Sequence, residues 1–269
     1  MLKPGFTLLV LACLMGASQP ATADVGFATL DRVQKANHLG LDTSITQFGG
    51  SDARAIRVEP YLVQMLRDFG VYAQLPISHA LPAEGDAETA LGNLEMGAFV
   101  PGALGGANTL LRLGLVLPTA RDKGENSIPL GQNIWPRLTD FINQIPDSMA
   151  LRASLSPIAH SGAFFFRGDF GVDLRLGEDG EDDEFILRAN LGVGARIARV
   201  RITLEMANIG NIDVPGADGF AQTAGLSIQH GILRASVVSV LEEGVDARIF
   251  TIGLCATQPV LRGGSGRWR

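Results

Sequence analysis

Two neighbouring stretches of the chain alternate strictly between apolar and polar side chains. From Phe164 to Leu176 the apolar residues occupy every second position, and after an acidic turn the alternation resumes from Phe185 to Ile197. A period of two residues predicts a β-strand with one apolar and one polar face. Each run lasts about twelve residues, roughly twice the mean strand length of a soluble protein. Strands of this length can cross a membrane on a tilt.

The same alternation along the rest of the chain predicts twelve strands, with connections that alternate in length. The predicted strands cover residues 37–48, 54–66, 69–78, 91–100, 109–118, 149–159, 163–176, 184–197, 200–208, 219–229, 232–241 and 246–256. Short connections lie at Arg67, Ser161, Arg199 and His230, and long ones at 79–90, 119–148, 177–183, 209–218 and 242–245. Two connections break the alternation, a short one at 49–52 and a long one at 101–108. Bacterial outer-membrane barrels combine an even strand number with short periplasmic turns and longer outer loops.

The first 23 residues have the pattern of a secretory signal peptide. Lys3 precedes an apolar run, and Ala21-Thr22-Ala23 is a small-residue cleavage site. An alternative is lipoprotein processing at Cys13. We expect residues 24–36 to form a periplasmic segment and residues 37–269 to form the barrel. Cleavage would leave a single cysteine, Cys255, so no internal disulfide is expected.

The pattern therefore predicts an all-β fold: a transmembrane, antiparallel, up-and-down β-barrel of about twelve strands in a bacterial outer membrane. A secreted β-sandwich is the alternative, because its strands also alternate. The low aromatic content, with two Trp and two Tyr, favours the sandwich, since barrels carry aromatic girdles. A net charge of −6 with scattered basic residues gives no support for nucleic-acid binding. The expected partners are outer-membrane lipid, the barrel-assembly machinery and a small-molecule solute.

Short pieces of the chain resemble an outer-membrane family known as the "MetA-pathway of phenol degradation" transporters. Leu91–Val100, followed by Leu110–Ala120, is similar to a pair of strands in that family, and Phe69–Ser78 is similar to the strand before them. The chain departs from the family pattern at Asn93 and at Ala120, where the family has Asp and Gly. It also lacks the terminal aromatic residue of a barrel's last strand. The resemblance implies a barrel that passes small, apolar or aromatic molecules, without catalytic residues.

The polar faces of the predicted strands supply candidate lumen residues. They are Arg57, Glu59, Glu95, Arg112, Arg152, Arg167, Asp169, Asp173, Arg175, Arg188, Arg196, Arg201 and Glu205. Charges of opposite sign on adjacent strands would pair and fill the interior. They could also form a selectivity lining. Twelve tilted strands about 4.8 Å apart give a backbone diameter of about 24 Å, which inward arginines would narrow to a small pore.

The connection 119–148 contains a predicted helix. Its apolar residues recur at helical spacing: Ile134, Leu138, Phe141, Ile142 and Ile145. Its polar face carries Arg137, Asp140 and Asn143, which could line an aqueous opening. The candidate constriction residues are Trp135, Arg137, Asp140 and Phe141. The helix is expected either to fold into the mouth of the barrel or to pack on its rim.

The sequence offers little for catalysis or for a cofactor or metal ion. The acidic turn at 177–184 lacks the spacing of a calcium loop and is expected to be a solvated hairpin tip. His160 and Ser161 are adjacent, but there is no Gly-x-Ser-x-Gly elbow and no His-Glu-x-x-His motif. We therefore expect a passive channel for small molecules and not an enzyme. The alternatives are a structural or surface-interaction barrel with a plugged lumen and an outer-membrane lipase.

Overall fold

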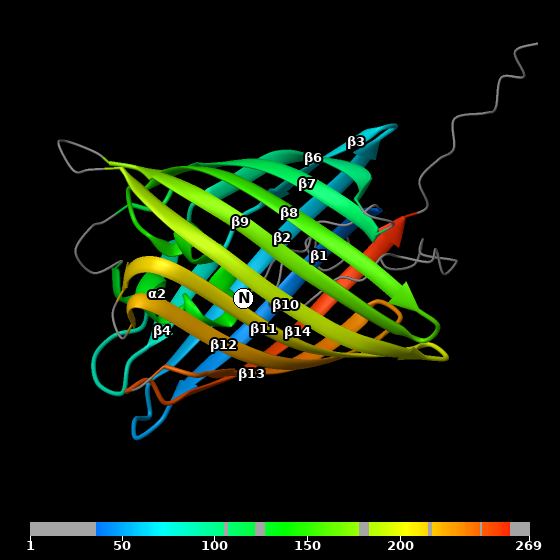
Figure 1. The fold of residues 1–269 in the computed structure, drawn as a ribbon. Helices are drawn as coiled ribbons and strands as arrows, with labels where there is room; N and C mark the ends of the chain where they lie inside the picture. Colours follow the sequence, from blue (N-terminus) through cyan, green and yellow to red (C-terminus); the bar gives the residue numbers. More distant parts are fainter. Residues whose placement is uncertain are drawn as a thin grey trace, which may run out of the picture.

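The computed structural model describes residues 36–104, 107–121, 127–177, 183–214, 217–242 and 244–258. These residues form a closed, antiparallel β-barrel (Figure 1). The predicted signal peptide, residues 1–23, and the predicted periplasmic segment, residues 24–36, lie outside the described residues except for Ala36.

The barrel closes because its first strand pairs with both the second and the last strand. The strands are β1 (Asn37–Phe48), β2 (Arg54–Leu66), β3 (Phe69–Gln74), β4 (Ile77–Leu81), β5 (Glu88–Leu91), β6 (Leu94–Leu104), β7 (Ala107–Leu117), β8 (Met149–Ser161), β9 (Phe164–Leu176), β10 (Glu184–Ile197), β11 (Val200–Val214), β12 (Ala217–His230), β13 (Leu233–Val240) and β14 (Ala247–Gln258). β2 pairs with β3 and then with β4, while β3 pairs with β6 and β4 with β5. Thus β3 and β4 share one position in the wall, and β5 and β6 share the next. The barrel has twelve strand positions, as the alternation predicted.

The two interruptions in the wall lie side by side and were not predicted. Pro76 separates β3 from β4, and it has no N–H to donate to a ladder. The amide of Gly92 donates to the carbonyl of Pro76 at 2.9 Å, and the amide of Asn93 turns inward to the carbonyl of Asn143 at 2.7 Å. A Cβ atom on Gly92 would lie 2.6 Å from that Asn143 oxygen, so glycine permits the close approach. Here the wall bonds to a segment inside the barrel.

The two ends of the barrel differ in their connections. One end, the short-turn end, carries the start of β1, the end of β14 and five two-residue connections: 67–68, 105–106, 162–163, 198–199 and 231–232. The first residue has φ near +60° in four of them, Arg67, Gly162, Ala198 and Gly231. Positive φ at this position is typical of two-residue hairpin turns, whose twist matches that of the strands. The other end, the long-loop end, carries the remaining connections, including 118–148.

Two predictions of long connections were wrong. β11 continues to Val214 and β12 begins at Ala217, so the connection predicted over 209–218 is only residues 215–216. Likewise β6 and β7 run through most of 101–108 and leave residues 105–106 between them. These two connections lie outside the described residues. Polar residues and glycine mimic a loop here, because a strand that continues beyond the lipid need not alternate.

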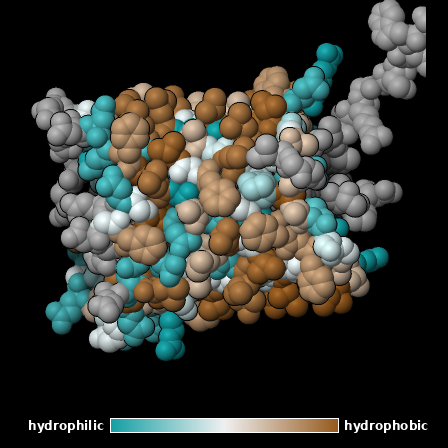
Figure 2. All heavy atoms as spheres, in the orientation of Figure 1, coloured by the Kyte–Doolittle hydropathy of each residue, from teal (hydrophilic) through white to brown (hydrophobic). Residues whose placement is uncertain are grey.

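The outer wall of the barrel is apolar. Brown, apolar side chains cover most of the wall seen in Figure 2, and teal residues gather at its ends. Large apolar residues on the strands remain half exposed, such as Leu113 (61%) and Phe164 (64%). The residues that alternate with these exposed residues along each strand are mostly buried. A closed barrel has no unpaired strand edge, which a bilayer requires. The fold is a transmembrane barrel, and the sandwich alternative is wrong.

A charge on this wall should destabilise the barrel in a depth-dependent way. Leu191 lies in the middle of β10 and faces outward, so Leu191→Arg should cost about 2–4 kcal/mol. The matched change Leu241→Arg, on an exposed residue at the long-loop end, should cost only about 0–1 kcal/mol. Urea unfolding in lipid vesicles measures both. Equal costs would contradict the assigned membrane position.

The connection between β7 and β8 contains two short helices, α2 (Ser127–Gln132) and the 3-10 helix η1 (Trp135–Gln144). Arg137 (φ −143°, ψ 78°) and Asp140 (φ −116°, ψ 25°) interrupt the helical backbone of η1. The prediction of one regular amphipathic helix was therefore wrong in detail. No helix in the described part of the chain is long and apolar enough to span a membrane.

Candidate functional site

Residues 133–144, which we call the inner segment, lie inside the barrel. Asn133 and all ten residues of η1 are buried. η1 contacts β1, β11, β12 and β14. Polar groups of the inner segment bond to β2, through the carbonyl of Asn133, and to β4 and β8. These strands belong to different sides of the wall, so the inner segment lies across the lumen near the long-loop end (Figure 1).

One side of the inner segment is apolar and packs on inward-facing residues of the wall. The segment contributes Ile134, Trp135, Leu138, Phe141 and Ile142 to this core, and the wall contributes Val116, Ala150, Phe165, Ile186, Ala207, Ile209, Ala221, Val238 and Ile249. Three of the wall residues are alanines, which leave room for the larger side chains of the segment. The wall is thus locally apolar on both faces where it meets the inner segment.

Asn93 fixes the opposite side of the inner segment. Its Nδ2 donates to the carbonyls of Ile142 at 3.2 Å and Ile145 at 2.6 Å, and its Oδ1 accepts from the amide of Ala120 at 2.9 Å. Asn93 is fully buried. One side chain therefore bonds to three backbone groups of the connection, and a buried group left without a partner would cost about 1–3 kcal/mol. The carbonyl of Ile142 also accepts from the amide of Ile145 at 3.4 Å.

Arg152 joins the inner segment to the wall. Its Nη1 contacts Glu95 at 2.5 Å and Asp140 at 3.3 Å, and its Nη2 donates to the carbonyl of Thr139 at 2.5 Å. Its Nε donates to Asp173 at 3.0 Å. Glu95 and Asp173 belong to the wall, whereas Thr139 and Asp140 belong to the segment. The guanidinium thus bridges the two with most of its hydrogen-bonding capacity in use.

Glu95 collects further donors from the wall and the segment. It accepts from Tyr72 Oη at 2.8 Å, Gln74 Nε2 at 2.9 Å and Asn143 Nδ2 at 3.0 Å. The Tyr72 ring crosses Gly97, where a Cβ would lie 2.6 Å from the ring. Glycine at this position lets the tyrosine reach the carboxylate. The charge of Glu95 is therefore well compensated in a site without exposure to solvent.

Other charges are paired within the wall alone. Arg188 lies 2.9 Å from Asp173 and 3.9 Å from Asp169. Arg234 on β13 lies 2.7 Å from Asp42 on β1, across the intervening strand β14. The strand between them presents Gly253, so that both side chains can meet above it. This pair spans the closure of the barrel.

The buried charges balance. Among the described residues, seven arginines and seven carboxylates are buried: Arg57, Arg112, Arg137, Arg152, Arg167, Arg188 and Arg234 with Asp42, Glu59, Glu95, Asp140, Asp169, Asp173 and Glu205. Unpaired charge in such an interior would cost several kcal/mol per ion. Equal numbers of opposite charges allow the polar interior to be stable.

Ten of the thirteen predicted lumen residues are buried inside the barrel, and the other three lie at its ends. Arg175 lies near the long-loop end, where it pairs with Glu184 at 3.0 Å. Arg196 and Arg201 are opposite each other near the short-turn end, and Arg196 is exposed. These three share the inward parity of the buried residues on their strands, but alternation gives the face of a residue and not its depth, so they stay candidates at the two ends of the lumen.

The four predicted constriction residues, Trp135, Arg137, Asp140 and Phe141, all lie within the inner segment and are buried. The expectation that the segment's polar face lines an aqueous opening was wrong. Arg137 Nε donates to Asp140 at 2.7 Å, and Asn143 donates to Glu95. Polar groups held in a narrow interior bond to one another and to the wall, because leaving them unpaired is costly.

Among the interior residues that the prediction missed are Asp42, Arg234, Tyr72 and Asn93. Asp42 and Arg234 occupy inward positions of predicted strands, so the same alternation that found the others could have found them. Tyr72 and Asn93 gave no such signal, since an aromatic residue and an amide are common on either face.

The features considered for catalysis do not form a site. His160 and Ser161 are consecutive residues of β8, so their side chains point to opposite faces of the sheet. Within the described ranges, no group of three or more His, Cys, Asp or Glu residues is placed to hold a metal ion. The acidic turn lies mostly outside those ranges, because residues 178–182 are not described.

Comparisons with known proteins identify the fold. No family model and no curated protein matches the chain. An outer-membrane channel from Pseudomonas putida F1 matches with a TM-score of 0.62 at 10% identity, covering 87% of this chain and 99% of the channel. The translocator domain of the autotransporter NalP from Neisseria meningitidis matches with a TM-score of 0.46 at 9% identity, covering 93% and 94%. The β domain of the Bordetella autotransporter BrkA has a TM-score of 0.45 at 14% identity, covering 83% and 100%.

The first of these matches shares its fold with this chain. A closed sheet, an apolar outer wall and that shared fold identify the chain as an outer-membrane β-barrel. The narrower resemblance to the phenol-degradation family stays a prediction.

Proposed function

We propose that the chain is an outer-membrane channel for small molecules, and not an enzyme, in which the inner segment narrows the lumen. The observation that carries the proposal is the attachment of this segment. The wall is joined by continuous ladders between strands, whereas the segment is held mainly by side chains such as Asn93 and Arg152. Side-chain contacts can be exchanged without breaking the ladder, so the segment is the part of the interior that can move.

We further propose that the solutes are small molecules with an apolar or aromatic body. Near the short-turn end, one side of the lumen is lined by an apolar cluster: Val63, Met65, Tyr72, Phe99, Leu110 and Ile158. Arg112 lies over the Tyr72 ring, 5.3 Å from its centroid, at the edge of this cluster. An apolar surface next to a cation suits a solute with an apolar body and a polar group. The resemblance to the phenol-degradation family supports the same class.

Single-channel recording of the parent and of Asn93→Ala tests the channel function. We expect small discrete steps from the parent. Asn93→Ala should give larger or more frequent openings, because three backbone groups each lose a hydrogen bond and the segment is loosened. The matched control is Asn190→Ala, since Asn190 is equally buried and its side-chain bonds within the described ranges are to the wall residues Asp169 and Asn208. Silence from the parent and from Asn93→Ala would contradict the proposal.

A structural or surface-interaction barrel with a plugged lumen is the second candidate. The balanced and buried interior charges support it, because such charges can compensate one another without a solvent-filled path. In this case neither asparagine variant would conduct, although both would fold and show heat-modifiable mobility on gels.

We also propose that the long-loop end faces the outside of the cell and the short-turn end faces the periplasm. Outer-membrane barrels have this asymmetry, and it would place residues 24–36 and the contact with the barrel-assembly machinery on the periplasmic side. In a Cys255→Ser background, Asp86→Cys should react with an impermeant thiol reagent in intact cells, and Arg199→Cys should not. Both residues are exposed, at opposite ends. Labelling of position 199 alone would invert the orientation.

A further inference from the structure

The outward-facing wall carries two charged side chains that the channel function does not use. Among the strand residues whose side-chain exposure the structure describes, Arg54 and Arg248 are the charged ones on this face, and both are exposed. The other outward positions are predominantly apolar. A charge facing lipid is costly near the middle of the membrane but tolerated at its boundary, where a long side chain reaches the headgroups.

The strand register places these two arginines at the same height. Gln47 on β1 is opposite Arg248 on β14 and also opposite Arg54 on β2. Because neighbouring strands lie about 4.8 Å apart, the two arginine backbones are about 10 Å apart, with an amide side chain between them. All three residues are at the long-loop end, and the exposed apolar residues Ile45 and Phe250 follow two positions deeper in the wall.

Neither arginine has a carboxylate partner within the part of the chain that the structure describes. Two other arginines at the same end do: Arg121 pairs with Asp147 at 3.1 Å, and Arg175 pairs with Glu184 at 3.0 Å. An unpaired guanidinium at the lipid boundary keeps its five donors available. Guanidinium groups bind phosphate oxygens in a bidentate manner.

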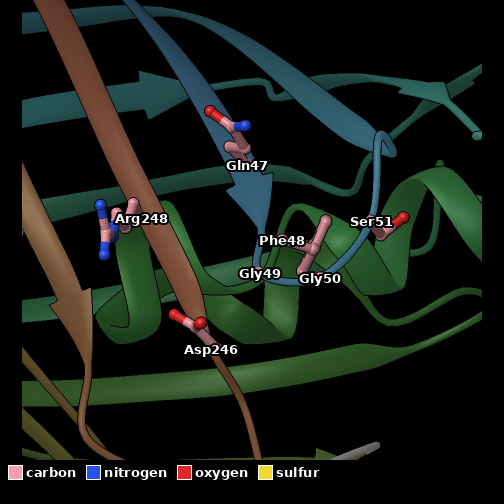
Figure 3. A pocket seen from close by; sticks show the side chains of 7 residues that line it. All are labelled: Gln47, Phe48, Gly49, Gly50, Ser51, Asp246 and Arg248. Atoms are coloured by element: carbon pink, nitrogen blue, oxygen red, sulfur yellow. The ribbon is translucent and has the colours of Figure 1, made fainter.

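A cavity of about 300 Å³ lies beside this row of residues (Figure 3). It is lined by Gln47, Phe48, Gly49, Gly50, Ser51, Asp246 and Arg248. Figure 3 shows the side chains of Gln47 and Arg248 on their two strands, with Asp246 below them near the turn. The cavity has room for a headgroup next to Arg248. The cavity also contains the carboxylate of Asp246, which would repel an anionic headgroup and weaken its binding.

We propose that Arg54, Gln47 and Arg248 bind the phosphate group of an anionic membrane lipid in the leaflet that meets the long-loop end. The two neighbouring positive charges match a phosphate group. The level of the two arginines on the wall matches the headgroup layer of the membrane, and the apolar residues deeper in the wall contact the acyl chains. If the long-loop end faces the outside of the cell, the bound lipid is a phosphorylated lipid of the outer leaflet. The site depends on the membrane position of the wall and not on conduction.

Lipid titration of the purified, folded barrel in neutral detergent tests this site. Short-chain phosphatidic acid should bind saturably, whereas phosphatidylcholine of the same chain length and inorganic phosphate should bind far more weakly. The double variant Arg54→Gln/Arg248→Gln should weaken binding by roughly tenfold or more, since hydrogen bonds to charged groups are lost. Asp246→Asn should tighten binding, because the repelling charge is removed.

The matched control is Arg67→Gln/Arg199→Gln, which removes two exposed arginines at the short-turn end. It should bind phosphatidic acid as the parent does. Heat-modifiable mobility establishes that every variant is folded. Parental binding by the Arg54/Arg248 double variant would overturn the site, and inorganic phosphate binding as tightly as phosphatidic acid would overturn a lipid as its occupant. Neither outcome would bear on conduction, so failure of this site is distinguishable from failure of the channel function.

Discussion

Deleting residues 128–146 should increase the single-channel conductance several-fold. The deletion removes the inner segment, which packs inside the barrel at the long-loop end. The ends of the connection already lie together, because the amide of Asp147 donates to the carbonyl of Ala120 at 3.0 Å. Residues 121–127 are therefore enough to close the loop. Without the segment, inward residues such as Arg152 and Glu95 would face water in a barrel of about 24 Å backbone diameter.

The control for this deletion replaces α2 with a Gly/Ser linker of equal length. α2 packs near the rim, where Leu130 contacts Ala90 and Ala120, so the control disturbs the same connection but keeps the inner segment. Planar-bilayer recording should give near-parental conductance for the control. Unchanged conductance of the deletion variant, with heat-modifiable mobility retained, would mean that other side chains close the lumen and would favour the plugged barrel.

The alternation of the sequence predicted the wall well because two solvents act on it. Lipid outside and a polar interior impose opposite demands on successive residues, so strands such as β9 and β10 are visible in the sequence with correct facing. The prediction failed where the strands extend beyond the lipid, because the outward residues there no longer need to be apolar. Beyond the bilayer the strands β11 and β12 continue through polar residues, which the sequence presents as a loop.

The sequence could predict which residues lie in the interior, but not which of them contact one another. Parity identified Arg152, Glu95 and Asp173 as inward residues, and the spacing of Ile134 and Leu138 indicated an apolar stripe that had to be buried. The partners of Arg152 could not be predicted, because they depend on strand register and on a segment that enters from another part of the chain. The interruption at Pro76 and Asn93 was missed for the same reason, since the inner segment replaces the missing ladder partner.

Replacing Arg152 with glutamine should release the inner segment. Arg152 contacts three carboxylates, Glu95, Asp140 and Asp173, in an interior without solvent exposure. Removing one partner of such a buried group typically costs about 3–5 kcal/mol, because uncompensated charge is left behind. The wall cannot rearrange without breaking its ladders, so water should enter and the segment should move outward. We expect larger conductance steps and faster proteolysis within residues 133–144.

Arg188→Gln is the matched control, because Arg188 is equally buried and also contacts Asp173, but none of its ion pairs reaches the inner segment. It should lower the temperature at which the barrel loses its folded gel mobility without raising conductance. Adding Glu95→Gln to Arg152→Gln removes one excess negative charge and should restore part of the lost stability. If Arg152→Gln and Arg188→Gln change conductance equally, Arg152 does not hold the segment in place. A rise for Arg152→Gln alone would identify its contacts with Asp140 and Thr139 as the attachment that keeps the lumen narrow.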